Sequence, residues 1–348
     1  MTHKKILYNI NNKKIGSKKP CFIIAEIGSN HNNNYKIAKK IILAAAKSGA
    51  DAVKFQTFKA KNHYSKYTPG FKYLKKINTF KLIEKLELNR SWQKNLKKYT
   101  EKLGLVFFSS PCDFEAVDQL NSLNVQIHKI ASFDITDKFL IKKIAESKKV
   151  IIISTGMANH KDIKNAIKTC LKAQNNKIIL LQCTSLYPAP SRLSNLLAIN
   201  SLYKKYHFLT GFSDHTIGDH NAIAAVALGA KVLEKHFTLN RKQKGPDHKF
   251  AMEPEEFKNM VRKIREIEKA IGDGKKNGPS REEFEMYSKG RRSVHASKDL
   301  KKGSIIKVDD LTVKRPSFGI SPFKINQILG KKIKKNIKYD QWITWDMI

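Results

Sequence analysis

The chain has few cysteines, and its four are not arranged as a structural set. Cys21, Cys112, Cys170 and Cys183 are scattered, with no C-x-x-C or C-x-x-H spacing among them. Cysteines at such spacings mark disulfide frameworks and structural zinc sites. The sequence therefore predicts neither of these, and we expect free thiols in a reducing compartment.

Long apolar runs are also missing. A membrane-spanning helix needs about 20 consecutive apolar residues, and no run in this sequence approaches that length. The first residues, MTHKKILYNINNKK, lack the continuous apolar stretch and the small-residue cleavage site of a secretory signal. The sequence therefore predicts a cytoplasmic protein without membrane contact.

Acidic residues are scarce beside basic ones: 30 Asp and Glu stand against 67 Lys and Arg, a formal net charge of +37. Such a balance normally indicates a nucleic acid or an anionic surface as partner. The lysines are, however, spread over nearly every helix-like segment, without an aromatic-interleaved stripe or an arginine-rich arm. Solvated basic faces are favoured over nucleic-acid binding, and a non-catalytic basic binding protein remains the alternative.

No G-x-G-x-x-G opens the first helix-like segment, so a dinucleotide-binding doubly wound sheet lacks its signature. The chain instead has eight apolar strand-like runs that alternate with amphipathic helix-like segments. Continuous apolar runs indicate parallel strands buried on both faces. Repeated over about 250 residues, such units predict an α/β fold of the (β/α)8 TIM-barrel type. The runs begin at Phe22, Ala52, Leu105, Ile127, Val150, Lys177, His207 and Lys231.

The barrel domain is predicted to cover residues 1–272, with a hairpin in residues 1–21 that closes its bottom. A Gly- and charge-rich linker is expected over residues 273–291. Residues 292–348 contain the short β runs SVHAS, SIIKV, LTVKRP and WITWD. They predict a small β-rich domain that is too modest to contain the active site alone.

Ligand-binding side chains of a barrel come from the carboxyl ends of its strands. His215 in GFSDH and His236 in VLEKH end two successive strands, so together they could hold one divalent metal. Lys54 and Lys129 interrupt apolar strands, where an unpaired ammonium is costly, so each is expected to meet an anionic ligand or an acid in an internal salt bridge. Glu26 interrupts FIIAEIG and is a candidate general base. The competing interpretation is a structural ion pair with a lysine such as Lys54.

Hydroxyl groups are frequent at the same strand ends, and Asp247 lies in the last loop above the barrel mouth. Ser and Thr donate hydrogen bonds to phosphate oxygens while lysine supplies point charge, so a phosphate-bearing ligand is expected. The hydroxyl residues are Ser109, Ser110, Ser132, Ser154, Thr155, Thr184, Ser185 and Ser213.

Nine ordered blocks along the chain are recognisable. They are IAEIGSNHNN, GADAVKFQTF, KIASFD, STGMA, QCTSLYPAP, GFSDHTIG, ALGAKVLEKHFTL, KGPDHKFAMEP and VKRPSFGIS. Together they resemble the sialic acid synthase family, which comprises N-acetylneuraminate synthases and their legionaminic, pseudaminic and spore-coat polysaccharide relatives. The resemblance runs from about Phe22 to the C-terminus. The segment RRSVHASKDLKKGSIIKVDDLTVKRP resembles the family's antifreeze-like domain, a SAF domain of the β-clip type.

The resemblance implies a metal-dependent condensation of phosphoenolpyruvate with an open-chain N-acylated amino sugar and water. The products are a nine-carbon 2-keto sugar acid and phosphate. The implied acceptor is N-acetylmannosamine or a 2,4-diacetamido-trideoxy hexose. His215 and His236 correspond to the ligands of a divalent ion, for which Mn²⁺ is expected and Mg²⁺ or Co²⁺ are alternatives. Glu26 corresponds to the residue that deprotonates or positions the water.

The resemblance also assigns binding residues and an assembly. The positions that correspond to phosphoenolpyruvate binding are Lys54, Gln56, Lys129, Ser132, Ser154, Ser185 and Ser213. Those that correspond to sugar contacts are Asp134, Tyr187, Asp247 and Arg315. Arg315 corresponds to the arginine that one subunit extends into its partner's barrel, so a domain-swapped homodimer is implied.

Three departures from the family pattern lie near the expected sugar site. Residues 131–134 read ASFD where many N-acetylneuraminate synthases have G-S-G-E, and Ser185 stands where Asn is common. Ser317 and Phe318 replace the usual Gly-containing pair after KRP. These departures leave the acceptor open. Another phosphoenolpyruvate-dependent sugar-acid synthase remains an alternative, although no added arginine cluster for a phosphorylated sugar appears at the strand ends.

Overall fold

The computed structural model describes residues 6–70 and 78–348. The chain divides into two compact units, with the boundary between Gly272 and Asp273. In the first unit, eight parallel strands close into a barrel in the order β10, β3, β4, β5, β6, β7, β8, β9. The predicted barrel is therefore confirmed. Its strands are β3 (Phe22–Gly28), β4 (Ala52–Thr57), β5 (Val106–Pro111), β6 (Ile127–Ile130), β7 (Val150–Ser154), β8 (Ile178–Cys183), β9 (Leu209–Asp214) and β10 (Val232–His236).

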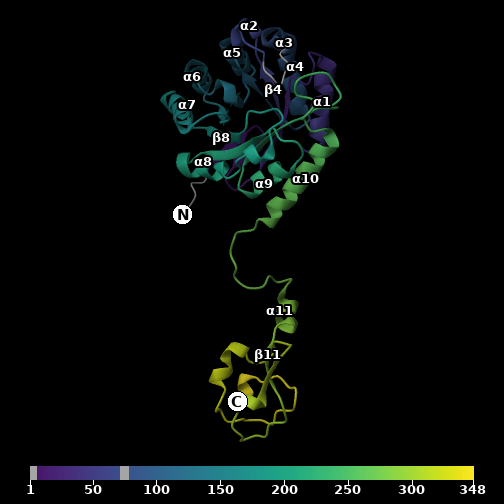
Figure 1. The fold of residues 1–348 in the computed structure, drawn as a ribbon, viewed down its shortest axis with the longest axis vertical. Helices are drawn as coiled ribbons and strands as arrows, with labels where there is room; N and C mark the ends of the chain where they lie inside the picture. Colours follow the sequence, from purple (N-terminus) through teal and green to yellow (C-terminus); the bar gives the residue numbers. More distant parts are fainter. Residues whose placement is uncertain (1–5, 71–77) are drawn as a thin grey trace. The chain divides into compact units, whose positions relative to one another are not determined.

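Helices surround these strands, as Figure 1 shows. Asn34 and Asp113 accept hydrogen bonds from backbone amides in the first turns of α1 and α5. Such side chains satisfy amides that have no partner within the helix. Gly49 follows α1 at φ +82°, a conformation that strains other residues. The helices are α1 (Tyr35–Lys47), α2 (Ala60–His63), α3 (Thr79–Leu86), α4 (Gln93–Lys102), α5 (Phe114–Ser122), α6 (Lys138–Glu146), α7 (His160–Lys172), α8 (Ala198–Tyr206), α9 (His220–Ala227) and α10 (Pro254–Ala270).

Side chains along each barrel strand point alternately into the barrel and outward to the helices. In β7, Ile151 and Ile153 pack in an outer cluster with residues of α6 and α7, whereas Ile152 belongs to the interior cluster. Interior positions are apolar at the start of a strand and polar at its end. In β3, Ile24 is an interior residue, and the next interior position along the strand is Glu26. The alternation therefore brings polar groups to the carboxyl-end mouth and leaves an apolar core below.

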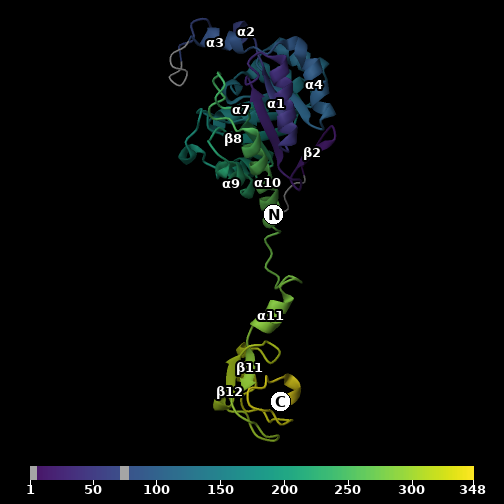
Figure 2. The ribbon, with the colours of Figure 1, turned by 90° about the vertical axis from the view of Figure 1, so that its right-hand side faces the viewer.

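An N-terminal hairpin joins β1 (Leu7–Ile10) to β2 (Lys13–Gly16) in antiparallel register. Ile10 and Ile15, at 1% and 0% exposure, belong to the interior cluster of the barrel. Figure 2 shows α2 and α3 at one end of the barrel and the hairpin toward the other. The interior is thus covered at the end opposite to the mouth.

The second unit has its own core and an antiparallel pair, β11 (Ser293–Ala296) with β12 (Leu311–Lys314). The predicted strands SIIKV and WITWD are wrong: within them only Ile305 and Trp342 form isolated bridges. Short 3-10 turns begin at Val308 and Trp345 and interrupt both runs. The stretch expected as a linker contains α11 (Phe284–Gly290).

No helix within residues 6–70 and 78–348 is both long and apolar enough to cross a membrane. The four cysteines are free.

Candidate active site

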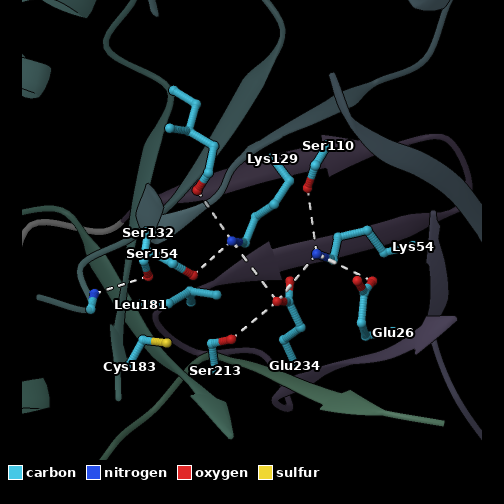
Figure 3. Close-up of polar contacts among 12 residues, drawn as sticks. Glu26, Lys54, Ser110, Lys129, Ser132, Ser154, Leu181, Cys183, Ser213 and Glu234 are labelled. Carbon is cyan, nitrogen blue, oxygen red and sulfur yellow. Dashed lines mark hydrogen bonds and ion pairs between the residues drawn. The ribbon is translucent and has the colours of Figure 1, made fainter. Parts of the chain in front are cut away.

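Two lysines and two glutamates meet at the floor of a cavity at the carboxyl ends of the barrel strands (Figure 3). Lys54 Nζ lies 3.2 Å from Glu26 Oε2 and 3.4 Å from Glu234 Oε1. Lys129 Nζ lies 3.9 Å from Glu234 Oε1 and donates a hydrogen bond to Ser154 Oγ at 2.6 Å. None of the four charged side chains is more than 5% exposed, so water screens their interactions weakly.

The two carboxylates have opposite proton affinities. Burial raises the pKa of Glu26 to about 7, although Lys54 acts to lower it. Burial also acts to raise the pKa of Glu234, but Lys129 and Lys54 hold it below the usual value. Glu234 is therefore ionised near neutral pH, while Glu26 can exchange a proton there. Such a split between neighbouring carboxyl groups is the arrangement that acid–base chemistry requires.

The two lysines line the cavity and are also paired with acids. Both interpretations from the sequence, ligand binding and internal salt bridge, are therefore compatible with their positions. Burial lowers the pKa of Lys129 even though Glu234 acts to raise it. Burial acts in the same direction on Lys54, but Glu234 and Glu26 outweigh it and raise the pKa. Lys129 is thus the less well compensated of the two cations.

The predicted hydroxyl groups gather around the same floor. Ser213 Oγ donates to Glu234 Oε1 at 3.1 Å, and Ser132 Oγ accepts from the Gly156 amide at 3.0 Å. A Cβ atom at Gly156 would lie 2.3 Å from Ser185 Oγ and 2.8 Å from Ser132 Oγ. A side chain at position 156 would therefore displace the hydroxyl groups of both serines. Within the described residues, Ser185 Oγ is buried without a hydrogen-bond partner, so it can donate to a ligand.

His215 and His236 come together as predicted, with ring centroids 5.4 Å apart. His215 Nδ1 lies 2.8 Å from the carbonyl oxygen of Thr184. A carbonyl oxygen only accepts hydrogen bonds, so Nδ1 carries a proton, and in the neutral ring Nε2 keeps its lone pair. Burial, together with His215, lowers the pKa of His236 well below its usual range, which keeps this ring neutral.

His236 therefore presents the neutral imidazole form that binds divalent metals. Burial acts to lower the pKa of His215 as well, but Cys183 and the Thr184 carbonyl oxygen outweigh it and raise that pKa, so a metal at this ring would have to displace a proton. In the part of the chain that the structure describes, His236 Nδ1 is buried without a hydrogen-bond partner, and Asp247 Oδ2 lies 3.8 Å away. These residues fit a metal as a partial ligand set. Among the same described residues, no cluster of three or more His, Cys, Asp and Glu forms a complete set. Water or substrate oxygens would have to supply the remaining ligands.

The predicted sugar-contacting residues Asp134, Tyr187 and Asp247 line the same cavity. The Tyr187 ring centroid lies 4.3 Å from that of His215. Burial raises the pKa of Asp247 to about 6. Arg315, in contrast, lies exposed in the second unit, where its Nε donates to the Gly290 carbonyl oxygen at 2.6 Å.

Reasoning from the sequence did not assign a role to several residues of this cavity. Glu234 is the main omission, because it contacts both lysines and Ser213. The sequence could have indicated Glu234, because it is a charged residue inside the strand-like run VLEKH, as Glu26 is in FIIAEIG. Cys183 also lines the cavity, with Sγ 3.8 Å from His215 Nδ1. The apolar lining residues from the β4–α3 region had no comparable signal, and they are Phe58, Leu82, Ile83 and Leu86.

Comparison with known proteins places this site in a family. The NeuB family model matches residues 41–276, and the SAF domain model matches residues 291–348. The chain is 46% identical over 332 residues to the N,N'-diacetyllegionaminic acid synthase of Campylobacter jejuni. This match covers 93% of this chain and 99% of the relative. The chain belongs to the NeuB family.

Two further relatives of this NeuB-family enzyme support the assignment. The pseudaminic acid synthase of Campylobacter jejuni is 36% identical over 338 residues, or 92% of this chain and 94% of the relative. The crystal structure of N-acetylneuraminic acid synthetase from Leptospira borgpetersenii has a TM-score of 0.75 at 34% identity, and the match covers 82% of this chain and 96% of that one. The family resemblance, the enzymatic interpretation and the SAF domain are thereby confirmed.

Proposed function

We propose that this NeuB-family enzyme condenses phosphoenolpyruvate with an open-chain N-acylated amino sugar and water to give a nine-carbon 2-keto sugar acid and phosphate. The observation that carries the proposal is the meeting of Lys54 and Lys129 with the proton-exchanging Glu26 at one cavity floor. The names of the relatives, synthases of legionaminic, pseudaminic and neuraminic acids, support the same class of product.

In this proposal, C3 of phosphoenolpyruvate forms a bond to the aldehyde carbon of the sugar, and C2 gains cationic character. Water adds to C2, and the bond from C2 to the phosphate oxygen then breaks. One water proton ends on the former aldehyde oxygen and the other on phosphate, so atoms and charge balance. Glu26 is placed to take the first proton from water, because burial brings its pKa to about 7.

The lysines and serines of the floor bind the phosphate and carboxylate of phosphoenolpyruvate in this scheme. Lys129 and Lys54 supply charge, while the hydroxyl groups of Ser132, Ser154 and Ser185 donate hydrogen bonds. His215 and His236 would hold the metal. When bound, that ion supplies Lewis-acid polarisation of the acceptor carbonyl, and we expect Mn²⁺, with Mg²⁺ or Co²⁺ as alternatives.

For the acceptor we favour a 2,4-diacetamido-trideoxy hexose of the legionaminic type. The apolar residues Phe58, Leu82 and Leu86 line the cavity and suit methyl groups, of which this sugar has three and N-acetylmannosamine one. No arginine lines the cavity among the described residues, which disfavours a phosphorylated acceptor. The 46% identity to a legionaminic acid synthase exceeds the 36% identity to a pseudaminic acid synthase, which favours the former sugar.

We also propose that the active enzyme is a cytoplasmic, domain-swapped homodimer in which Arg315 of one chain reaches the sugar in its partner's barrel. Family resemblance and the exposure of Arg315 support this assignment.

The test is phosphate release from phosphoenolpyruvate with Mn²⁺. N-acetylmannosamine is compared with two 2,4-diacetamido-trideoxy hexoses, one of the legionaminic and one of the pseudaminic type. Release that depends on the legionaminic-type sugar is the expected result. Release that prefers N-acetylmannosamine contradicts the acceptor assignment, and silence with all three sugars contradicts the reaction. Leu86→Ser, with the exposed neighbour Lys85→Ser as control, should lower kcat/KM for the diacetamido sugar. The expected decrease is about fourfold for each sugar methyl group that packs against Leu86, at about 0.8 kcal/mol per buried methyl.

A further inference from the structure

A second buried ion pair lies just outside the barrel wall, next to the two histidines. Lys235 Nζ contacts Asp214 Oδ2 at 2.7 Å, with the side chains 1% and 0% exposed. Asp214 directly precedes His215, and Lys235 directly precedes His236. Neither Asp214 nor Lys235 lines the cavity, because adjacent residues of a strand point to opposite faces.

This pair belongs to a closed network that includes the residue after His215. Asp214 Oδ1 accepts from the Thr216 amide at 2.8 Å and from Thr216 Oγ1 at 2.7 Å. Lys235 Nζ donates to the Thr216 carbonyl oxygen at 2.5 Å. The backbone amide and carbonyl of Thr216, directly after His215, are therefore held by buried, charge-assisted hydrogen bonds, which are stronger than neutral ones.

The pairing of β9 with β10 places this network on the outer face of the barrel wall, next to a hydrogen bond on the inner face. Lys235 is paired with Asp214 in the register of β10 and β9, and Glu234 is paired with Ser213. Glu234 and Ser213 are joined by a hydrogen bond inside the barrel, at 3.1 Å. The two strands are thus joined on both faces, by the outer pair one residue before each histidine and by the inner pair two residues before it.

Stability alone is a weak explanation for the outer pair. Replacing a buried ion pair by apolar groups of similar volume is often neutral or stabilising, because removing two charges from water offsets their attraction. What such a network supplies is a fixed geometry. A displacement of β9 against β10 by one residue would also reverse the faces of all their side chains.

We infer that Asp214 and Lys235 are positioning residues, which hold His215 and His236 at the separation needed to bind one metal ion. The inference rests on the proposed function, since the metal is part of that proposal. Groups that hydrogen-bond a metal-binding imidazole directly change metal affinity about 10- to 100-fold when they are replaced, and we take the same range for this pair, which acts through the backbone next to the histidines.

The experiment measures Mn²⁺ affinity by calorimetric titration of the metal-free full-length enzyme. Lys235→Met is compared with the wild type and with Arg265→Met, which removes another ion pair of the barrel, between Arg265 and Asp51. The Kd for Mn²⁺ is expected to rise about 10- to 100-fold in Lys235→Met and to stay unchanged in the control. Because Lys235→Met leaves the buried Asp214 carboxylate without its cation, its melting temperature is expected to fall, so both titrations are run at a temperature at which each variant is folded. Excess Mn²⁺ should restore the kcat of Lys235→Met.

Asp214→Asn provides a second variant of nearly the same shape, in case Lys235→Met does not fold. It is expected to weaken Mn²⁺ binding in the same direction. Unchanged Mn²⁺ affinity in a folded variant would overturn the positioning role and leave the proposed reaction untouched. A wild-type enzyme that binds no divalent metal would overturn both the metal proposal and this inference.

Discussion

Replacing Lys129 by methionine distinguishes the two roles that its position allows. Lys129 is 2% exposed, burial lowers its pKa, and its contact with Glu234 is long, at 3.9 Å. If the ammonium is there to bind phosphoenolpyruvate, Lys129→Met removes a charged hydrogen bond of about 1.5–3 kcal/mol. The KM for phosphoenolpyruvate should then rise about 10- to 150-fold.

Stability should move little in this variant. Glu234 keeps Lys54 at 3.4 Å and Ser213 at 3.1 Å, and methionine fills most of the lysine volume without a charge to bury. If Lys129 served instead as a structural tie, breaking the buried pair would cost about 3–5 kcal/mol. At about 2–4 °C per kcal/mol for a domain of this size, the melting temperature would fall by roughly 6–20 °C.

The assay combines steady-state phosphate release over a range of phosphoenolpyruvate concentrations with thermal unfolding of the same preparation. Lys142→Met is the matched control, because Lys142 is 65% exposed and pairs with Glu146 on the surface of α6. A folded Lys129→Met enzyme with unchanged KM would refute the ligand-binding role. A large loss of stability with unchanged KM would establish the structural one.

The remaining predictions concern other parts of the site and the core. His215→Ala or His236→Ala should abolish phosphate release and leave the melting temperature near that of the wild type; a rate that chelators do not affect would exclude the metal. Glu26→Gln should lower kcat about 10²- to 10⁴-fold, and full activity would end its assignment as general base. Arg315→Ala should raise the KM for the sugar and spare that for phosphoenolpyruvate. Mixing Arg315→Ala with a barrel-inactive variant should restore activity by subunit exchange, and failure to do so would speak against the swapped dimer. Burial lowers the pKa of His128 to about 4. Between about pH 6.5 and 4 the unfolded chain binds a proton that the folded chain does not. As the pH falls through this range, the free energy of unfolding should therefore decrease by about 1.4 kcal/mol per pH unit. Denaturant titrations should show a flatter pH dependence in His128→Asn.

The barrel could be predicted because its strands are buried on both faces. Continuous apolar runs such as VIIIS are typical of parallel strands, and several of them end in a polar residue, as β7 does at Ser154. The same feature identified Lys54 and Lys129, since a charged residue inside an apolar run is conspicuous.

The remaining parts depend on contacts that sequence spacing does not encode. Glu234 became central only when the closed barrel brought β4, β6 and β10 around one point, with Lys54 and Lys129 both within 3.9 Å of its Oε1 atom. Leu82 and Leu86 have the helical spacing of any core residue, so the spacing alone does not identify them as residues of the cavity lining. In the SAF domain, SIIKV and WITWD have strand-like composition, but turns limit each to a single bridging residue.

The hairpin at the base of the barrel bears on the kinetics of the enzyme. Ile10 and Ile15 are packed into the interior core, so among residues 6–70 and 78–348 the cavity floor with Lys54 and Lys129 is open only at the mouth. A ligand on the floor must therefore arrive before any ligand that fills the mouth, and must leave after it. Initial-rate kinetics should accordingly be ordered, and a molecule that occupies the mouth alone should act as a dead-end inhibitor against the substrate that binds first.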